Sequence, residues 1–273
     1  MAVITLCSAS GSPGVTSTVL GLALTWPRPV VVVEADPTGG SAVLAGYFQG
    51  QVQPSDGLVE LLLAHRHHRL AETLPGLLIE FPESPVRLLP GIREHAQATS
   101  VAGVWEPLVV ALRELGATGQ DVLVDAGRLG LVGSPAPLII GADVTALVTD
   151  SGLPSLAAAR SWAGWLAENR VVIPGRTGLV VVGEGRPYRA AEVTRTLGLP
   201  VWGSIDWDPA GARVFSHGDS RPRRFDSSAL VRSLRACGDT LRTTTERPYL
   251  PRAPFLHALL ERVLQERAMG AVR

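Results

Sequence analysis

The strongest constraint on the fold is a glycine-rich turn near the start of the chain, where residues 8–18 read S-A-S-G-S-P-G-V-T-S-T. The apolar run Val3–Leu6 precedes this turn, and a helical pattern at Val19–Leu24 follows it. A turn between a buried strand and a helix gathers backbone N–H groups, and the helix N-terminus adds about half a positive charge. The sequence therefore predicts either a phosphate-binding turn or a connection that needs glycine and binds no ligand.

Short apolar runs alternate with helical patterns along most of the chain, which indicates an α/β fold. The alternation predicts a doubly wound, mostly parallel sheet of about seven strands flanked by helices. The expected strands are Ala2–Cys7, Val30–Val33, Val86–Leu89, Asp121–Asp125, Val144–Val148, Leu179–Val182 and Val201–Ile205. After the first helix, the expected helices are Ser55–Leu74, Val104–Leu115, Ser155–Ala167, Arg189–Leu197, Pro209–Phe215 and Ser227–Leu241.

Acidic residues follow two of the expected strands. Asp36 belongs to the segment Glu34–Gly39, which reads E-A-D-P-T-G, and Asp125 ends an apolar run just before Ala126 and Gly127. Ligands of open α/β sheets bind at the carboxyl ends of the strands, and Mg²⁺ prefers oxygen ligands. Both carboxylates are therefore candidates for a metal site. The alternatives are a turn-capping aspartate before proline and an ordinary strand end.

The turn resembles the deviant Walker A loop of the ParA/MinD branch of P-loop NTPases (SIMIBI class), which reads G-K-G-G-V-G-K-T-T. When this loop is laid without gaps on residues 9–17, Gly11 and Gly14 match loop glycines and Thr16 matches the hydroxyl that binds Mg²⁺. Residues 34–39 resemble the switch I motif D-x-D-P-x-G, and residues 121–127 resemble a Walker B strand. The resemblance covers about residues 2–218 and implies a P-loop NTPase fold.

The resemblance also implies ATP and Mg²⁺ as ligands, bound weakly or not at all. The metal ligands that it implies are Thr16, Asp36 and Asp125, and Asp36 would position the attacking water if the protein is active. In relatives an asparagine contacts the base, and this chain has Gly183 and Glu184 at the corresponding position. The resemblance also implies that a loop lies near the base, and in this chain that loop is residues 206–209. The implied nucleotide-binding residues are Gly11, Ser12, Gly14, Val15, Thr16, Ser17 and Arg128.

Both lysines of the family motif are missing. Ser10 takes the place of the signature lysine and Val15 that of the P-loop lysine, and the chain contains no lysine elsewhere. A charge-assisted hydrogen bond contributes about 1.5–3 kcal/mol, and phosphoryl transfer depends on such charges. We therefore expect ATP hydrolysis to be slow or absent. Arg128 is the candidate for replacing part of the lost charge, and a surface arginine without a role is the alternative.

Three functions follow from these observations. The first is spatial positioning or assembly of a cellular machine of the pilus, secretion-system or septum type, because the TadZ/CpaE-like positioning branch of the family is similar in tolerating an atypical P-loop. The second is a slow ATPase of chromosome or plasmid partition, and the third is a scaffold that binds a partner protein without nucleotide. The resemblance implies a homodimer and a protein partner from the positioned machine.

Charge is distributed unevenly along the chain. Residues 1–220 contain 14 arginines and 20 acidic residues, whereas residues 221–273 contain 11 arginines and 5 acidic residues. We expect a domain at 1–242, followed at 243–273 by a proline-rich connector and an amphipathic helix at Phe255–Met269. The basic C-terminal region predicts contact with nucleic acid or an anionic membrane, or else solvated helix faces and a linker. The last helix could equally dock on a partner or on its own domain.

The sequence constrains the cellular location and the metal content of this protein less strongly than its fold. No apolar run reaches the roughly 20 residues that span a bilayer, and no export signal pattern is present. Two cysteines are too few for a disulfide framework. We expect a cytoplasmic protein, peripheral at the membrane if the last helix binds lipid. His65 and His68 lie about one helical turn apart, where they either chelate a metal or decorate a solvated face.

Overall fold

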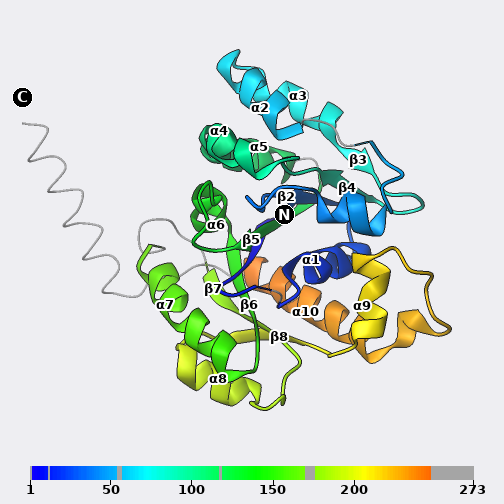
Figure 1. Cartoon of the computed structure of the whole chain (residues 1–273), viewed down its shortest axis with the longest axis vertical. Helices are drawn as coiled ribbons and strands as arrows, with labels where there is room; N and C mark the ends of the chain where they lie inside the picture. The colour runs from blue at the N-terminus through cyan, green and yellow to red at the C-terminus, as the bar shows by residue number, and fades with distance from the viewer. Residues whose placement is uncertain (1, 12, 54–56, 117–118, 170–175, 247–273) are drawn as a thin grey trace, which may run out of the picture.

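The computed structural model describes residues 2–11, 13–53, 57–116, 119–169 and 176–246. Their strands form one sheet in the order β3-β4-β2-β5-β1-β6-β7-β8. Figure 1 shows helices on both faces of this sheet. The strands are β1 (Val3–Ser8), β2 (Val30–Glu34), β3 (Ile79–Glu80), β4 (Val86–Leu89), β5 (Asp121–Arg128), β6 (Val144–Asp150), β7 (Arg176–Val182) and β8 (Val201–Ile205).

Among the described residues, the α-helices are α1 (Val15–Leu24), α2 (Gly57–Arg66), α3 (Leu70–Thr73), α4 (Ala98–Val101), α5 (Trp105–Gly116), α6 (Ala136–Gly141), α7 (Leu153–Asn169), α8 (Ala190–Leu197), α9 (Pro209–Ser216) and α10 (Ala229–Glu246). Short helical turns are η1 (Val43–Tyr47), η2 (Leu74–Leu77), η3 (His95–Gln97), η4 (Ala102–Val104) and η5 (Phe225–Ser227).

The predicted doubly wound parallel sheet is confirmed. Every neighbouring pair is parallel except β3 and β4, which pair antiparallel. The sheet has eight strands rather than about seven because β3 adds a two-residue edge. A pair of residues carries no periodic pattern, so β3 depends on its partner strand and is invisible in the sequence.

The sheet separates two layers of apolar side chains, and β2 shows how. Val30 and Val32 pack with residues of α1, α9 and α10, whereas Val31 and Val33 pack on the opposite face with residues of α2 and α5. Successive side chains of a strand point to opposite faces, so a strand covered on both sides must be apolar throughout. This explains the unbroken valine run.

One predicted helix, Ser55–Leu74, is wrong as a single element. The structure has α2 and α3 instead, with His68 in a left-handed conformation (φ 56°) between them. The N–H of Arg69 donates to the carbonyl oxygen of Ala64 at 2.9 Å, which closes the end of α2. The turn lets Leu70 and Leu74 reach the core, because a straight helix would carry them away from it.

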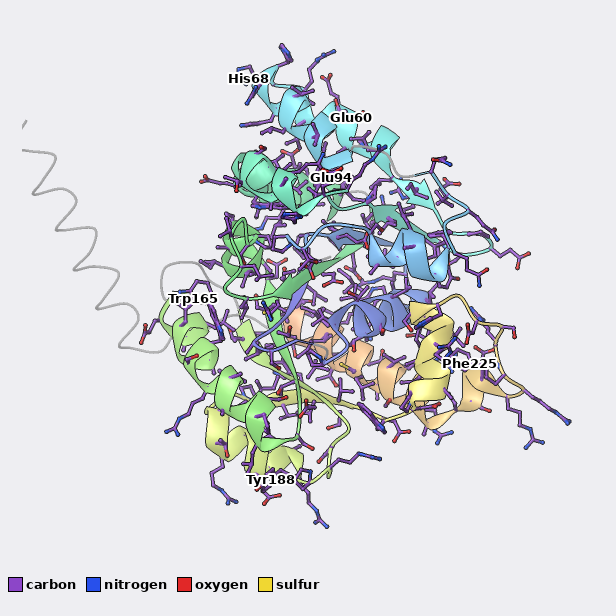
Figure 2. The ribbon with its side chains drawn as sticks, viewed as in Figure 1. Glu60, His68, Glu94, Trp165, Tyr188 and Phe225 are labelled. Carbon is purple, nitrogen blue, oxygen red and sulfur yellow. The ribbon has the colours of Figure 1, made fainter. Side chains whose placement is uncertain are left out.

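The histidines of this turn stay in solvent. His65 and His68 are exposed, and Figure 2 shows His68 at the outer tip of the molecule. Among the described residues, no group of three or more His, Cys, Asp or Glu side chains is arranged to hold a metal ion. The exposure of both side chains agrees with a solvated surface.

The last described helix runs further along the chain than expected. Helix α10 begins at Ala229 and continues to Glu246, so residues 243–246 are helical rather than part of a connector. The predicted helix at Phe255–Met269 lies outside the described residues, and the division at residue 242 stays a prediction. Within the described part of the chain, no helix is long and apolar enough to cross a membrane.

A buried carboxylate anchors the ends of the central strands that lie opposite the predicted site. Asp121, at the start of β5, is 1% exposed and accepts hydrogen bonds from the N–H of Ala2 at 3.1 Å and the indole N–H of Trp26 at 2.8 Å. The guanidinium of Arg28 pairs with the same carboxylate at 2.8 Å. These contacts fix the β1–β5 register and so align the carboxyl ends of both strands.

Candidate functional site

The glycine-rich turn ends in a left-handed residue. Gly14 is the N-cap of α1 with φ 85° and ψ 37°, a conformation that favours glycine. Among the described residues no side chain caps this helix, and its first turn holds no acidic residue. The first N–H groups of α1 therefore remain available to an anion. The space beside Gly11 in the same turn is open, because a Cβ added there would meet nothing within 4 Å.

A pocket of about 510 Å³ opens over this turn, and we call it the P-loop pocket. The loop after β2 contributes Asp36 to its wall, and the end of β5 contributes Arg128. Ser12 lies outside the described residues. The structure thus brings six of the seven residues implied for nucleotide binding into one pocket: Gly11, Gly14, Val15, Thr16, Ser17 and Arg128.

Val15 contributes apolar packing to the turn. It lines the P-loop pocket but is only 6% exposed, and it belongs to the core on the α1 face together with Val19 and Val43. The position of the family's P-loop lysine therefore carries a buried methyl-bearing side chain and no charge. The neighbouring Pro13 has no N–H, which removes one more donor from the turn.

Thr16 and Asp125 are joined directly. The Thr16 hydroxyl donates a hydrogen bond to the Asp125 carboxylate, and the N–H of Gly127 donates to Asp125 Oδ1 at 3.0 Å. Asp125 is 3% exposed, and this burial raises the pKa of its carboxyl from 3.8 to about 7, although both hydrogen bonds act in the opposite direction. Without a bound cation, this carboxyl is therefore partly protonated near neutral pH.

Asp36 lies against the end of β5. Its Oδ1 accepts a hydrogen bond from the N–H of Thr38 at 2.9 Å, the pattern of a turn-forming aspartate. A Cβ added to Gly127, which has φ 59°, would lie 2.2 Å from both Cγ and Oδ2 of Asp36. The two predicted acidic strand ends are therefore neighbours, and a residue without a side chain at position 127 makes this approach possible.

Glu34 has a role that sequence reasoning missed. It is 6% exposed and accepts hydrogen bonds from the Ser41 hydroxyl, the N–H of Val43 at 3.1 Å and the N–H of Gly91 at 3.3 Å. Burial raises the pKa of its carboxyl. Glu34 thus holds the loop that follows β2 against the loop that follows β4. Partners 7 and 57 residues away leave no signal in the local sequence.

A small cavity of about 40 Å³ lies between the acidic side chains and α1. Thr16, Glu34, Asp36 and Asp125 line it and supply hydroxyl and carboxylate oxygens. Mg²⁺ prefers such ligands and usually keeps several of its waters, so it needs few direct protein contacts. The donor set fits a hydrated Mg²⁺ held by the Thr16 hydroxyl, with Asp36 and Asp125 near its water shell. Glu34 is occupied by the loop contacts described above.

Arg128 is exposed at the end of β5 and lines the P-loop pocket. Ser8 pairs with it across β1 and β5, which sets the start of the glycine-rich turn beside it. No acidic side chain in the described part of the chain forms an ion pair with Arg128. Its guanidinium is therefore available to an anion in the pocket.

An apolar crevice of about 190 Å³ extends from the turn toward the loop after β8. Pro13, Trp207 and Phe215 are among its lining residues, so the loop at residues 206–209 borders the site as expected. Glu184 does not point to a base here, because its carboxylate accepts a hydrogen bond from the N–H of Ala190 at 2.8 Å and caps α8. The crevice offers apolar walls to a ring and no asparagine to read it.

Solved structures with the same fold match most of the chain. The septum site-determining protein MinD complexed with Mg-ADP from Pyrococcus horikoshii OT3 matches with a TM-score of 0.65 at 16% identity, covering 86% of this chain and 93% of that chain. The MinC:MinD cell division protein complex from Aquifex aeolicus matches with a TM-score of 0.64 at 15% identity, covering 91% and 98%. A ParA family ATPase from Chlorobium tepidum TLS matches with a TM-score of 0.65 at 16% identity, covering 86% and 96%.

Comparison by sequence gives a different result, since no protein-family model and no curated protein matches this chain. At the low identities of the structural matches, the likeness establishes the fold. It agrees with the resemblance that the motifs at residues 9–17, 34–39 and 121–127 predict, and with the site that these three segments form at the carboxyl ends of β1, β2 and β5.

Proposed function

We propose, on the premise that this chain has the ParA/MinD-type P-loop NTPase fold, that it positions or assembles a cellular machine through a weakened nucleotide site. One observation carries the proposal: Thr16, Asp36, Asp125 and Arg128 converge on the uncapped start of α1, although the chain contains no lysine. The proposal assigns Mg²⁺ to the hydroxyl and carboxylate oxygens of these residues, while most of the positive charge for phosphate is missing. Binding without efficient hydrolysis is what such a site can do.

The neighbours in fold support a nucleotide and a protein partner. One is MinD complexed with Mg-ADP, and another is the MinC:MinD complex. We propose accordingly that this protein acts as a homodimer and binds a protein of the machine it places. A peripheral position at the membrane and the TadZ/CpaE-like branch belong to the same proposal.

Calorimetric titration with Mg-ATP and Mg-ADP at low salt tests the proposal, with a phosphate-release assay on the same sample. We expect measurable heat of binding and no phosphate release above background. Absence of heat up to millimolar nucleotide would contradict the proposal and leave a nucleotide-free scaffold. The matched control is Thr16→Val, which removes the hydroxyl that contacts Asp125 while keeping the side-chain volume.

A second candidate is the slow ATPase of chromosome or plasmid partition. Asp36 favours it, because its carboxylate lines both the P-loop pocket and the small acidic cavity and so lies where it could orient a water. Phosphate release that Asp36→Ala abolishes would establish this activity. Release that survives the substitution would come from a contaminating enzyme.

Arg128 gives a sharper prediction. We expect Arg128→Ala to weaken Mg-ATP binding about tenfold, because a charge-assisted contact to phosphate contributes about 1.5–3 kcal/mol. Arg128→Lys should keep most of the affinity, because the charge remains. Titration calorimetry of both variants measures the effect, and the exposed Arg160 of α7 supplies the control Arg160→Ala. Equal affinity of Arg128→Ala and the wild type would make Arg128 a surface arginine.

Restoring the lysines tests the alignment of the turn. The double substitution Ser10→Lys and Val15→Lys should strengthen Mg-ATP binding by tenfold or more, because the family's two cations return to a turn of matching geometry. Val15 is buried but lines the P-loop pocket, so a lysine there can extend into the pocket. Thermal melting without nucleotide checks that the core tolerates it. Unchanged affinity in a folded variant would argue against the alignment.

A further inference from the structure

The apolar crevice is continuous with the P-loop pocket. Both cavities are lined by Pro13, Gly14, Ser17 and Phe215. A phosphate on the turn and a ring in the crevice can therefore belong to one ligand. At about 190 Å³ the crevice is smaller than the roughly 300–1,000 Å³ of sites for drug-sized ligands, which suits a single ring system. Trp207, which is 49% exposed, supplies an aromatic wall for such a ring.

The crevice carries acidic side chains and no basic one. Of the described residues that line it, only Asp206 and Asp208 are charged. Asp208 is occupied, because its Oδ1 accepts the N–H of Gly211 at 2.9 Å and caps α9. The backbone N–H of Asp206 donates to the Ser233 hydroxyl at 3.0 Å, which fixes the end of β8 against α10. Within the described part of the chain, the exposed Asp206 carboxylate has no hydrogen bond or ion pair and is free to bind a ligand.

The arginines near the crevice are engaged elsewhere. A hollow of about 670 Å³ adjoins it, and Asp206 and Trp207 line both cavities. Arg186 and Arg232 line the hollow and not the crevice. The guanidinium of Arg186 lies over the indole of Trp207, 5.5 Å from the ring centroid, and that of Arg232 donates to the carbonyl oxygen of Ser227. The crevice therefore presents an acceptor to a bound ring and no competing cation.

Glu184, at the position where the resemblance implies contact with the base, is not the residue that reads a ring in the crevice. It lines the hollow only. Its carboxylate accepts the N–H of Ala190 at 2.8 Å and the hydroxyl of Ser204. Asp206 is thus the acidic side chain that remains for recognition.

The edge of one nucleobase matches a free carboxylate. An ionised carboxylate only accepts hydrogen bonds, and its two oxygens lie side by side. Guanine presents two adjacent donors, the ring N1–H and the 2-amino group. Adenine and cytosine place an acceptor nitrogen beside their amino group, and the imide N–H of uracil lies between two carbonyl oxygens. A carboxylate repels those acceptors, so guanine is the base that engages both oxygens without a conflict.

We propose that Asp206 makes the nucleotide site select guanine over adenine, with its carboxylate accepting the N1–H and the 2-amino group of the base. This inference rests on the proposed function, because the base reaches the crevice only when phosphate binds at the glycine-rich turn. It adds a specificity that differs from the ATP implied by the resemblance. Trp207 packs on the ring and contributes to the binding of either purine.

Calorimetric titration of the full chain with the magnesium complexes of three diphosphates tests the preference. We expect guanosine diphosphate to bind at least about tenfold more tightly than adenosine diphosphate. Inosine diphosphate should fall between them, because it keeps the N1–H and lacks the 2-amino group. Adenosine diphosphate binding as tightly as guanosine diphosphate would overturn the guanine preference and leave the nucleotide site standing. No heat with any of the three would overturn both.

Asp206→Asn tests the residue through a change of preference. The amide still accepts the N1–H of a purine, but it donates where the carboxylate accepted. We expect the variant to bind guanosine diphosphate about tenfold more weakly and to prefer xanthosine diphosphate, whose 2-carbonyl accepts that donor. The wild type should reject xanthosine diphosphate, because this carbonyl faces the carboxylate. A variant that keeps the wild-type order of affinities would overturn the assignment.

Two control variants separate recognition from packing and from overall charge. Trp207→Ala should weaken guanosine and adenosine diphosphate by the same factor, because both purines present an aromatic face. Asp239→Asn removes the same charge from an exposed position on α10 outside both cavities and should leave both affinities unchanged. Melting temperatures without nucleotide verify folding. If Asp239→Asn altered the ratio of the two affinities as Asp206→Asn does, the preference would come from net charge and the proposal would be overturned.

Discussion

Asp125→Asn should make the ligand-free protein more stable at alkaline pH while removing the Mg²⁺-dependent nucleotide binding that we propose. The carboxyl of Asp125 is buried, and this burial raises its pKa in the folded protein to about 7, above the ordinary value of 3.8. The folded protein therefore favours the neutral form of the Asp125 carboxyl, and an ionised carboxylate at this position lowers the free energy of unfolding. An asparagine has the same shape, can accept the N–H of Gly127 and can donate to the hydroxyl of Thr16, and it never becomes charged.

The sign and window of the pH effect follow from the raised pKa. The contribution of Asp125 to stability is fully present below pH 3.8, declines as pH rises, and is lost above pH 7. Between pH 5 and pH 8 the wild type should lose roughly 2 to 3 kcal/mol of unfolding free energy through this group, and Asp125→Asn should not. Urea unfolding in the presence of a chelator measures the difference.

Asp239→Asn is the control, because the side chain of Asp239 on α10 is 65% exposed. This substitution should leave the pH dependence of the unfolding free energy as in the wild type. Glu34, whose pKa is also raised by burial, should keep a residual pH dependence in every variant. Parallel pH curves for the wild type and Asp125→Asn would show that Asp125 stays ionised in the folded protein.

Gly127→Ala should destabilise the protein by about 3 kcal/mol and disable the site. Alanine in a left-handed conformation costs roughly 1–2 kcal/mol, and the new Cβ must also displace Asp36, with Cγ and Oδ2 only 2.2 Å away. Moving Asp36 breaks its hydrogen bond with Thr38 and shifts the loop after β2. Urea unfolding measures the loss of stability, and titration with Mg-ATP measures the loss of binding.

Two further variants separate the cost of the clash with Asp36 from the cost of alanine in a left-handed conformation. Gly198→Ala is the matched control, because Gly198 is also left-handed (φ 71°) and its Cβ would meet nothing within 4 Å, so only the backbone cost remains. Combining Gly127→Ala with Asp36→Gly removes the clashing side chain and should recover at least about 1 kcal/mol relative to the sum of the single effects. Strict additivity would mean that Asp36 moves freely away from position 127.

Local sequence patterns were sufficient for the elements that form the site. The valine run at residues 30–33, the acidic ends of β2 and β5 and the turn before α1 each carry their signal within a few neighbouring residues. Strand composition, glycine content and the position of a carboxylate at a strand end depend on backbone geometry that is the same in every parallel sheet. The fold class followed from them, and the resemblance of the motifs to the ParA/MinD family then implied the candidate residues of the P-loop pocket.

The sequence by itself determined the sheet, the turn and the kind of residue at each strand end. Only the tertiary structure decided that Glu34 ties two loops together, that Gly127 admits Asp36, and that Trp207 shares a hollow with Arg232 of α10. Each of these depends on a contact between segments that lie far apart in the chain and adjacent in the sheet. Periodicity describes how one segment folds, whereas which segments meet depends on strand order, and strand order is a property of the whole packed core.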